Sequence, residues 1–292
     1  MKTITIHAPA KINLGLDVLR KRTDGYHDVK MIMQTVGIFD DITITKTEEP
    51  GIRLQADHPD IPTDDSNLIC KAAKLFLNTY SIKNGVQINL VKRIPVAAGM
   101  AGGSTDAAST LLGLNQLFDI NASIAELQIL GVKIGADVPY CILQGTALSE
   151  GIGEKLTILK SAPECYLVIA KPPIFVSTKY AYDNLHANEL AFHPDIDSIR
   201  DAIEKGNLAG MADKLENVLE TVTTKEYPVI DRMKNILKEQ GALNAIMSGS
   251  GPTVFGIFDD REKAEAGFRA IIDSGLSKEV YQTGFYNPET TD

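Results

Sequence analysis

A run of small residues lies directly in front of an apolar helical pattern, in the segment PVAAGMAGGSTDAASTLLGLNQLF at residues 95–118. Most residues in its first half are Gly, Ala or Ser. Residues 86–94, VQINLVKRI, alternate like a strand, so the run joins a predicted strand to a predicted helix. Three structures compete for it: a flexible linker, a tight structural turn, and a cradle for an anion.

The physics of this junction favours an anion cradle. Small residues let the backbone approach a ligand closely, and the first N–H groups of the following helix are unpaired at the positive end of its dipole. Ser104 and Thr105 add hydroxyls that suit a phosphate oxygen or a magnesium ion. The flanking strand and helix leave little slack for a linker, whereas small residues that merely permit tight helix packing remain an alternative.

Spacing excludes three common motifs. A Walker A loop needs a Lys before its Ser or Thr, but Ser104 follows Gly102 and Gly103 directly. The intervals between Gly99, Gly102 and Gly103 do not fit G-x-G-x-x-G. No G-x-S-x-G nucleophile elbow occurs in the chain.

Periodicity along the chain predicts a mixture of strands and helices. Alternation and β-branched residues predict strands at residues 4–8, 12–19, 29–36, 41–46, 86–94, 165–173, 243–249, 253–258 and 279–286. Helical patterns occupy residues 67–80, 123–134 with a Ser123–Glu126 capping box, much of 174–240, and 260–274. Residues 135–155 are predicted to form a turn, an apolar strand and a Gly-rich exit. Partial segregation of strands and helices indicates an α+β fold, with predicted domains at residues 1–155 and 156–292.

Composition indicates a globular protein without a membrane segment. The chain has 292 residues, of which 44% are hydrophobic, enough for one large domain or two ordinary ones. Its longest apolar runs, such as residues 165–170, fall far short of the roughly 20 residues that a membrane-spanning helix needs. The N-terminus lacks the apolar core of a signal peptide. We therefore expect a cytoplasmic protein with no membrane partner.

Charge and cysteine content exclude further classes. The 29 basic and 38 acidic residues give a net charge of −9 without a basic tract, so nucleic acid is not an expected partner. Cys70, Cys141 and Cys165 are widely spaced in apolar contexts, which favours buried reduced thiols. No cysteine or histidine pair has the spacing of a structural zinc site.

The pattern P-x-x-x-G-M-A-G-G-S-T, from Pro95 to Thr105, resembles the phosphate-binding motif of the GHMP kinases, in which this loop wraps the phosphates of ATP. Two further signatures of that family stand at the expected ends of the chain, APAKINLGLDV at residues 8–18 and IMSGSGPTVFGIF at residues 246–258. The resemblance implies an N-terminal ATP-binding domain and a C-terminal ferredoxin-like domain, with the active site in the cleft between them.

Three other segments narrow the resemblance within the family. They are RTDGYHDV at residues 22–29, GADVPYCI at residues 135–142 and SEGIGEKL at residues 149–156. They resemble kinases that use ATP and Mg²⁺ to phosphorylate the 2-hydroxyl of a diphosphocytidyl alcohol in the non-mevalonate isoprenoid pathway. Another GHMP kinase of small alcohols and a catalytically silent nucleotide-binding relative remain alternatives, and the chain would be a monomer or a homodimer.

The resemblance also assigns roles at the reacting groups. Asp137 falls on the catalytic aspartate of the family and Lys11 on its partner lysine. A carboxylate orients the acceptor hydroxyl and takes its proton, and a lysine holds the carboxylate ionised and stabilises the transferring group. Asn13, two residues further on the same face of a strand, would hydrogen-bond to either and contact substrate.

Substrate and nucleotide contacts are carried over in the same way. Tyr26 and His27 match residues that meet the cytosine, Thr178 matches a substrate contact, and Tyr182 matches a second stacking ring for which Tyr180 competes. The implied ATP contacts are Pro95, Val96, Ala97, Ala98, Gly99, Met100, Ala101, Gly102, Gly103, Ser104, Thr105, Asn67, Lys92 and Asn115. No metal ligand from the protein is assigned, although the chemistry of the Ser104 and Thr105 hydroxyls suits a magnesium ion.

The loop departs from the family pattern at four positions. Ala97, Ala98 and Ala101 replace common glycines, so we expect these alanines to avoid positive φ. Asp106 stands where Asn or Ser is frequent, which is compatible with phosphate binding if its carboxylate faces away or helps to hold magnesium. The second glycine turn, Ser248 to Gly251, is expected to pack near the first loop.

Overall fold

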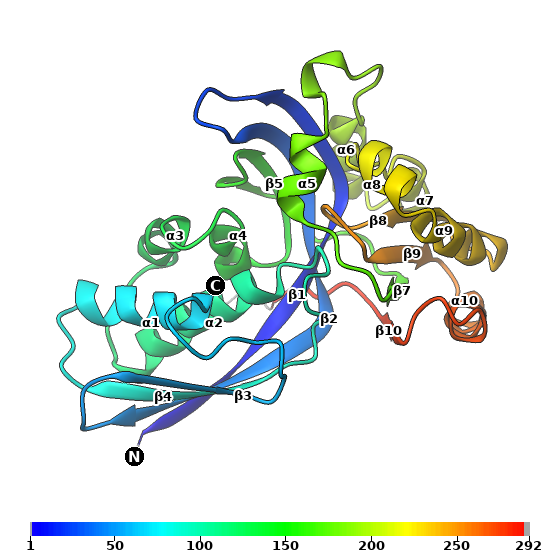
Figure 1. Ribbon diagram of the computed structural model, residues 1–292. Coiled ribbons are helices and arrows are strands. Elements are labelled where there is room, and N and C mark those ends of the chain that lie inside the picture. The colour runs from blue at the N-terminus through cyan, green and yellow to red at the C-terminus, as the bar shows by residue number, and fades with distance from the viewer. Residues whose placement is uncertain (1, 289–292) are drawn as a thin grey trace. The chain divides into compact units, whose positions relative to one another are not determined.

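The computed structural model describes residues 2–288, which divide into two compact units (Figure 1). Unit 1 comprises residues 2–10, Ile38–Val96 and Ala101–Gln144, and unit 2 comprises Lys11–Gly37, Ala97–Met100 and residues 145–288. The predicted domain boundary at residue 155 stays a prediction.

Two long strands run through both units. They are β1 (Thr3–Lys21) and β2 (His27–Thr47), and each spans two of the short strands that the sequence predicts. The interruption predicted within each of them was wrong. Residues 8–18 of β1 are buried without a break, so both faces of the strand carry apolar or internally paired side chains and the alternation disappears.

Unit 1 is a sheet with helices packed on it. Strand β4 (Gly85–Val91) lies between β2, to which it is antiparallel, and β3 (Ile52–Ala56), to which it is parallel. Helices α1 (Leu68–Thr79) and α2 (Gly102–Leu117) lie against one face of these strands and against each other (Figure 1). The shorter helices α3 (Ile124–Val132) and α4 (Val138–Leu143) pack beside them, and the predicted Ser123–Glu126 capping box of α3 is confirmed.

Helix α4 corrects a prediction. We expected an apolar strand directly after the turn at residue 135, but residues 138–143 form a helix and the strand, β5 (Thr146–Gly151), follows it. The apolar run is too short for periodicity to distinguish the two structures. Pro139 in the first turn suits a helix start, because its missing N–H would have no partner there.

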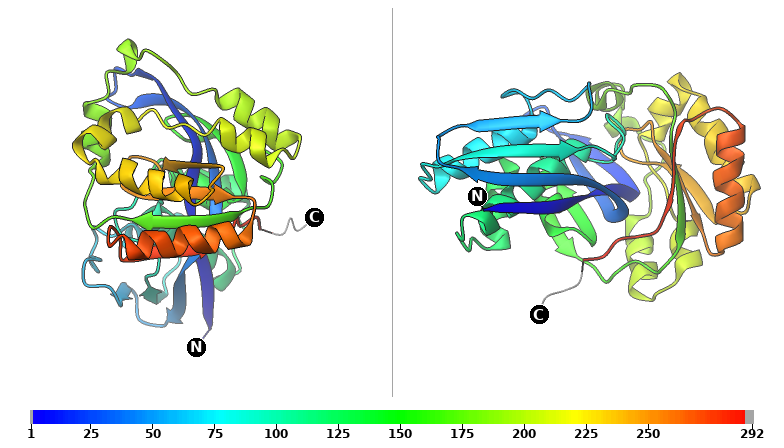
Figure 2. Two further views of the ribbon diagram at one scale, coloured as in Figure 1. Left: turned by 90° about the vertical axis from the view of Figure 1, so that its right-hand side faces the viewer. Right: turned by 90° about the horizontal axis from the view of Figure 1, so that it is seen from below.

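Unit 2 contains a four-stranded antiparallel sheet in the order β10-β7-β9-β8. Its strands are β7 (Tyr166–Lys171), β8 (Asn244–Met247), β9 (Val254–Phe258) and β10 (Glu279–Thr283). Helices α9 (Val229–Glu239) and α10 (Arg261–Asp273) cover it, as the left view of Figure 2 shows. This strand order with two covering helices is the ferredoxin-like arrangement, as expected.

Unit 2 contains two further strands and a helical segment. Strand β5 pairs with residues 29–34 of β2 and with β6 (Lys155–Ile158), both antiparallel. Between β7 and α9 the chain is helical, as predicted. These helices are α5 (Thr178–Asp183), the 3-10 turn η1 (Ala187–Glu189), α6 (Ile196–Glu204), α7 (Leu208–Asp213) and α8 (Glu220–Glu226).

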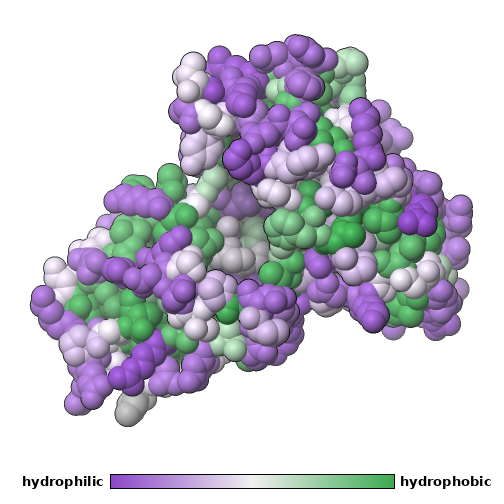
Figure 3. All heavy atoms as spheres, in the orientation of Figure 1, coloured by the Kyte–Doolittle hydropathy of each residue, from purple (hydrophilic) through white to green (hydrophobic). Residues whose placement is uncertain are grey.

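Two of the three cysteines occupy the buried positions that the sequence predicts. Cys70 and Cys141 are buried, and Cys165 is half-buried, with burial raising its pKa to about 12. In residues 2–288, no helix has the length and apolar character to cross a membrane. On the face displayed in Figure 3, hydrophilic residues are interspersed with smaller apolar patches.

Candidate active site

The glycine-rich segment at residues 95–105 leads from β4 into α2 and presents backbone N–H groups at the helix start. The first backbone hydrogen bond of α2 runs from the N–H of Thr105 to the carbonyl oxygen of Ala101, at 2.9 Å. The N–H groups of residues 102–104 precede this bond at the positive end of the helix dipole. No acidic residue lies in the first turn. This geometry supports an anion cradle over a linker.

Two alanines of this segment take the backbone conformation that we expected them to avoid. The φ angle is 52° at Ala97 and 56° at Ala101, whereas Ala98 keeps a negative φ. The expectation was therefore wrong for Ala97 and Ala101. The segment holds the left-handed shape that glycine would take there, and each β-carbon is tolerated at roughly 1–2 kcal/mol.

Ala101→Gly is expected to raise the free energy of unfolding by up to about 1 kcal/mol, because glycine takes a φ of 56° without a β-carbon clash. Ala98→Gly is the matched control. Its negative φ and buried methyl predict a decrease of about 0.4–1 kcal/mol or more. Urea unfolding of both variants measures the two signs, and a decrease for Ala101→Gly would contradict the strain assigned to that position.

Residues 97–100 are held by the second glycine turn, as predicted. The hydroxyl of Ser248 donates to the carbonyl oxygen of Gly99 at 3.0 Å. A β-carbon on Gly99, where φ is +71°, would lie 2.3 Å from the carbonyl oxygen of Ser248. Only glycine therefore permits this approach. The N–H of Lys11 donates to the carbonyl oxygen of Met100 at 3.2 Å, which ties the same residues to β1.

Lys11 and Asn13 form a buried pair on one face of β1. The Lys11 ammonium donates to the Asn13 side-chain oxygen at 2.7 Å, and the Asn13 amide contacts the sulfur of Met31 at 3.3 Å. Lys11 is 5% exposed and Asn13 is fully buried. The predicted hydrogen bond between them is confirmed. An ammonium held this way presents a fixed positive charge.

Asp137 precedes α4 in unit 1. Its backbone occupies the N-cap position with φ −82° and ψ −15°, but its side chain accepts no capping hydrogen bond from the helix. The ordinary role of an Asp at a helix start, capping the first N–H groups, therefore does not account for this carboxylate. Lys11 and Asp137 belong to different units.

An aromatic pair lies beside the D-G-Y-H turn in unit 2. The rings of His27 and Tyr182 lie 5.1 Å apart at 45°, and the Nε2 atom of His27 is buried without a hydrogen-bond partner. Burial, assisted by the charge of Lys21, lowers the pKa of His27 from its ordinary value, which favours the neutral ring. Tyr26 is 57% exposed. The contact with His27 favours Tyr182 over Tyr180 as the second ring.

Comparison with known proteins identifies the family. The GHMP kinases N terminal domain matches residues 67–145, and the GHMP kinases C terminal domain matches residues 195–276. A curated relative from Lachnoclostridium phytofermentans, named 4-diphosphocytidyl-2-C-methyl-D-erythritol kinase, is 54% identical over 286 residues, covering 98% of each chain. The chain belongs to the GHMP kinase family. This GHMP kinase is accordingly an ATP-dependent phosphotransferase with the two-domain fold of its family.

Two further comparisons agree. A relative of the same name from Lachnospira eligens is 51% identical over 288 residues, covering 99% of this GHMP kinase and 100% of the relative. The crystal structure of a 4-(cytidine 5'-diphospho)-2C-methyl-D-erythritol kinase superposes with a TM-score of 0.83 at 28% identity, covering 98% of this chain and 100% of that one.

A buried charge cluster in this GHMP kinase lies under the first turn of α2. The Lys92 ammonium donates to Asp106 at 2.8 Å and to Asp40, and the three side chains are at most 4% exposed. A β-carbon added to Gly102 would lie 2.9 Å from the Lys92 nitrogen, so the ammonium packs directly against the helix start. The Asp106 carboxylate therefore faces Lys92. A carboxylate turned to a partner within the protein is compatible with phosphate binding by the loop, as expected for this position.

The cluster also shapes the chain before the loop. The second carboxylate oxygen of Asp40 accepts from the N–H groups of Arg93 and Ile94 at 2.6 and 2.8 Å. Burial raises the pKa of Asp106 to about 8 against the opposing charge of Lys92. Burial alone would lower the pKa of Lys92, but Asp106 and Asp40 outweigh it and the pKa is raised. Sequence reasoning missed Asp40, because its partners lie far away in the chain.

The resemblance places three of the implied ATP contacts, Asn67, Lys92 and Asn115, near the adenosine, and all three bind protein atoms in the structure. Asn67 caps α1, accepting from the N–H of Ile69 at 2.8 Å, and the Asn115 amide exchanges two hydrogen bonds with the backbone of Ala122. Lys92 belongs to the charge cluster. Their contact with nucleotide stays a prediction, and each side chain is held in place by hydrogen bonds within the protein.

Proposed function

We propose that this GHMP kinase transfers the γ-phosphoryl group of ATP to the 2-hydroxyl of 4-diphosphocytidyl-2-C-methyl-D-erythritol. The names of the relatives at 54% and 51% identity support this substrate. Within the structure, the observation that carries the choice is the buried, unpaired ring nitrogen of His27 beside Tyr182. A neutral imidazole next to stacking rings suits the polar edge and the face of a pyrimidine.

The proposed chemistry is a direct transfer. The Asp137 carboxylate orients the acceptor hydroxyl and takes its proton as the bond from oxygen to the γ-phosphorus forms. The bond between the γ-phosphorus and the bridging oxygen breaks, and ADP leaves. Lys11, fixed by Asn13, stabilises the negative charge on the transferring group, and the N–H groups of residues 102–104 hold the phosphates.

The residues present fit a magnesium ion bound with ATP. The Thr105 hydroxyl is buried in the first turn of α2 without a hydrogen-bond partner, and Ser104 precedes it. Hydroxyl oxygens are suitable Mg²⁺ ligands alongside phosphate oxygens, so Ser104 or Thr105 would hold the ion. Bound there, magnesium neutralises charge that develops on the phosphates. Cytoplasmic location, the monomeric or homodimeric state and the lack of a nucleic-acid partner stay predictions.

Variants of the ring residues test the substrate assignment. Tyr26→Ala and Tyr182→Ala are expected to raise the KM for the cytidine substrate roughly tenfold, since a stacked base contributes about 1–3 kcal/mol. His27→Ala should act in the same direction. The KM for ATP should change little, and CMP should compete with the cytidine substrate.

Tyr180→Ala is the matched control from the same helix, α5, and should leave the KM for the cytidine substrate nearly unchanged. Steady-state kinetics with each substrate varied in turn separates the two constants. Loss of affinity for ATP alone in the Tyr26 and His27 variants, or no competition by CMP, would reject the proposed cytidine site.

A further inference from the structure

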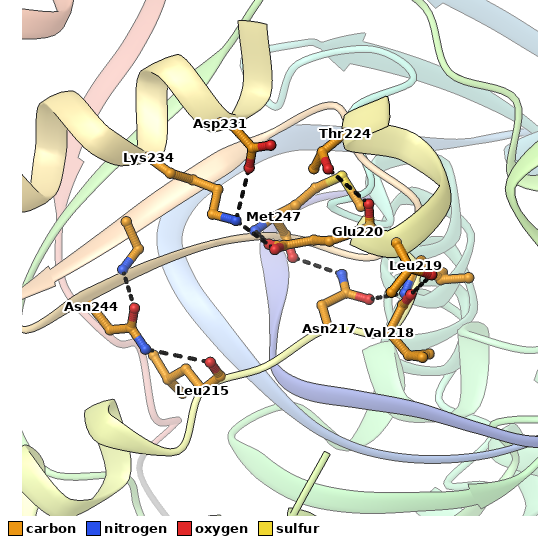
Figure 4. Close-up of polar contacts among 12 residues, drawn as sticks. Leu215, Asn217, Val218, Leu219, Glu220, Thr224, Asp231, Lys234, Asn244 and Met247 are labelled. Carbon is orange, nitrogen blue, oxygen red and sulfur yellow. Dashed lines mark hydrogen bonds and ion pairs between the residues drawn. The ribbon is translucent and has the colours of Figure 1, made fainter. Parts of the chain in front are cut away.

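The turn Ser248–Gly251 is itself held by a segment that carries no recognised motif, residues 215–224. Figure 4 shows the polar contacts of this segment around Asn217 and Glu220. The Asn217 amide nitrogen donates to the carbonyl oxygens of Met247 and Gly249, both at 2.8 Å. Its side-chain oxygen accepts from the N–H of Leu219 at 3.0 Å. Asn217 is 5% exposed. Both ends of its amide are therefore used: one of its three hydrogen bonds reaches the turn at Gly249, and another reaches Met247, the residue before the turn.

Neighbouring side chains secure the rest of the turn. One carboxylate oxygen of Glu220 accepts from the N–H of Met247 at 2.6 Å, and the other accepts from Lys234 at 2.5 Å. The Thr223 hydroxyl donates to the carbonyl oxygen of Ser250 at 3.3 Å. Figure 4 shows the side chains of Asn217 and Glu220 both directed at Met247. The segment thus hydrogen-bonds to the backbone of Met247, Gly249 and Ser250.

The same segment is joined to the strand that carries Lys11. The N–H of Leu16 donates to the carbonyl oxygen of Glu216 at 3.0 Å. The N–H of Val218 donates to the carbonyl oxygen of Leu16 at 2.9 Å. These bonds flank Asn217 on both sides. Asn217 therefore connects β1 to the glycine turn, and the Ser248 hydroxyl continues the connection to Gly99 in the first glycine-rich segment.

We propose that Asn217 is a positioning residue for the phosphates of ATP. It acts through the turn Ser248–Gly251, whose contact with Gly99 sets the backbone of residues 97–100. The inference rests on the proposed function, because it takes residues 95–105 as the phosphate loop. An Asn suits the position because its two amide hydrogens reach two carbonyl oxygens while its oxygen takes an N–H, which no apolar or acidic residue of that size does.

Asn217→Asp tests the inference with almost no change of shape. The new carboxylate would face two carbonyl oxygens that have lost their donors, so the turn would shift. We expect the Kd of a non-hydrolysable ATP analogue to rise about tenfold or more, as the loss of a buried hydrogen-bonded contact does. The KM for ATP should rise with it, while the KM for the cytidine substrate changes little.

Asn244→Asp is the matched control. The Asn244 amide nitrogen also donates to two backbone carbonyls, those of Ala212 and Leu215 (Figure 4). Its oxygen accepts from the N–H of Ala245, so within residues 2–288 its side-chain hydrogen bonds lie outside the glycine turn. This variant should lose stability to a similar extent and keep the wild-type affinity for the analogue. Circular dichroism at the assay temperature establishes that both variants are folded.

Ser248→Ala keeps the inference testable if Asn217→Asp does not fold. It removes one buried hydroxyl and its hydrogen bond to Gly99, and should weaken analogue binding in the same direction by a smaller factor. Unchanged binding in Ser248→Ala and Asn217→Asp, or equal weakening in Asn244→Asp, would overturn the inference. Failure of the unmodified enzyme to bind the analogue would overturn the proposed function as well, which distinguishes the two failures.

Discussion

Replacing Asp137 by Asn is expected to lower kcat by about 10²–10⁴-fold, the usual contribution of a positioned general base. The amide keeps the size of the side chain but cannot accept the proton of the acceptor hydroxyl. The Asp137 side chain caps no helix N–H, so the substitution removes no hydrogen bond from the start of α4. Single-turnover assays at saturating substrate report the change directly.

The affinity for nucleotide should survive this substitution, because the proposed phosphate contacts come from residues 95–105. Asp119→Asn is the control: its carboxylate is 78% exposed and pairs with Lys2 at the surface, so kcat should stay at the wild-type value. Wild-type turnover in Asp137→Asn would remove Asp137 from its assigned role. A parallel loss of ATP affinity would point to a role in binding instead.

Lys92→Met is expected to lower the free energy of unfolding by about 3–5 kcal/mol, the usual effect of removing one partner from a buried ion pair. The variant leaves the carboxylates of Asp40 and Asp106 buried without their cation. Lys74→Met is the control, because Lys74 and Asp65 form an exposed pair at 3.2 Å that should contribute at most about 1 kcal/mol. Urea unfolding at pH 7.5 compares the two.

The loss of unfolding free energy in Lys92→Met should depend on pH in a definite direction. In wild type burial raises the pKa of Asp106 to about 8 although the charge of Lys92 lowers it, so removing the ammonium moves that pKa further above its value in the unfolded chain. The folded variant then binds more protons than folded wild type near this pH, and its unfolding free energy relative to wild type should fall as pH rises from about 7 to 9. A deficit that grows toward low pH would contradict this assignment of charges.

Local signals predicted most of the fold correctly. The capping box at Ser123 and Glu126, the alternation of β4 and the apolar run of β7 each depend on neighbouring residues, which a sequence displays directly. Where burial covers both faces, as in residues 8–18, alternation vanished and one strand was predicted as two. The short run at residues 138–143 was equally ambiguous and proved to be a helix.

In the candidate site, too, features set by neighbouring residues were predicted and features set by distant residues were not. The Lys11–Asn13 pair follows from two positions on one strand face, and its hydrogen bond was predicted. Long-range hydrogen bonds were not predictable in this way. The bond from Asn217 to Met247 joins residues 30 positions apart, and the bond from Lys92 to Asp40 joins residues 52 positions apart, so no local pattern reveals them. The positive φ of Ala97 and Ala101 was also not predicted. The conformational preference of alanine does not show where the surrounding chain enforces a strained backbone.

The direct measurement is the reaction itself. The protein is incubated with ATP, Mg²⁺ and 4-diphosphocytidyl-2-C-methyl-D-erythritol, and phosphorus NMR with mass spectrometry follows the products. The account predicts ADP together with a substrate that has gained one phosphate as a monoester at its 2-hydroxyl, with neither product formed by Asp137→Asn at a comparable rate. ATP that remains intact, or ADP released with an unmodified diphosphocytidyl alcohol, would contradict it.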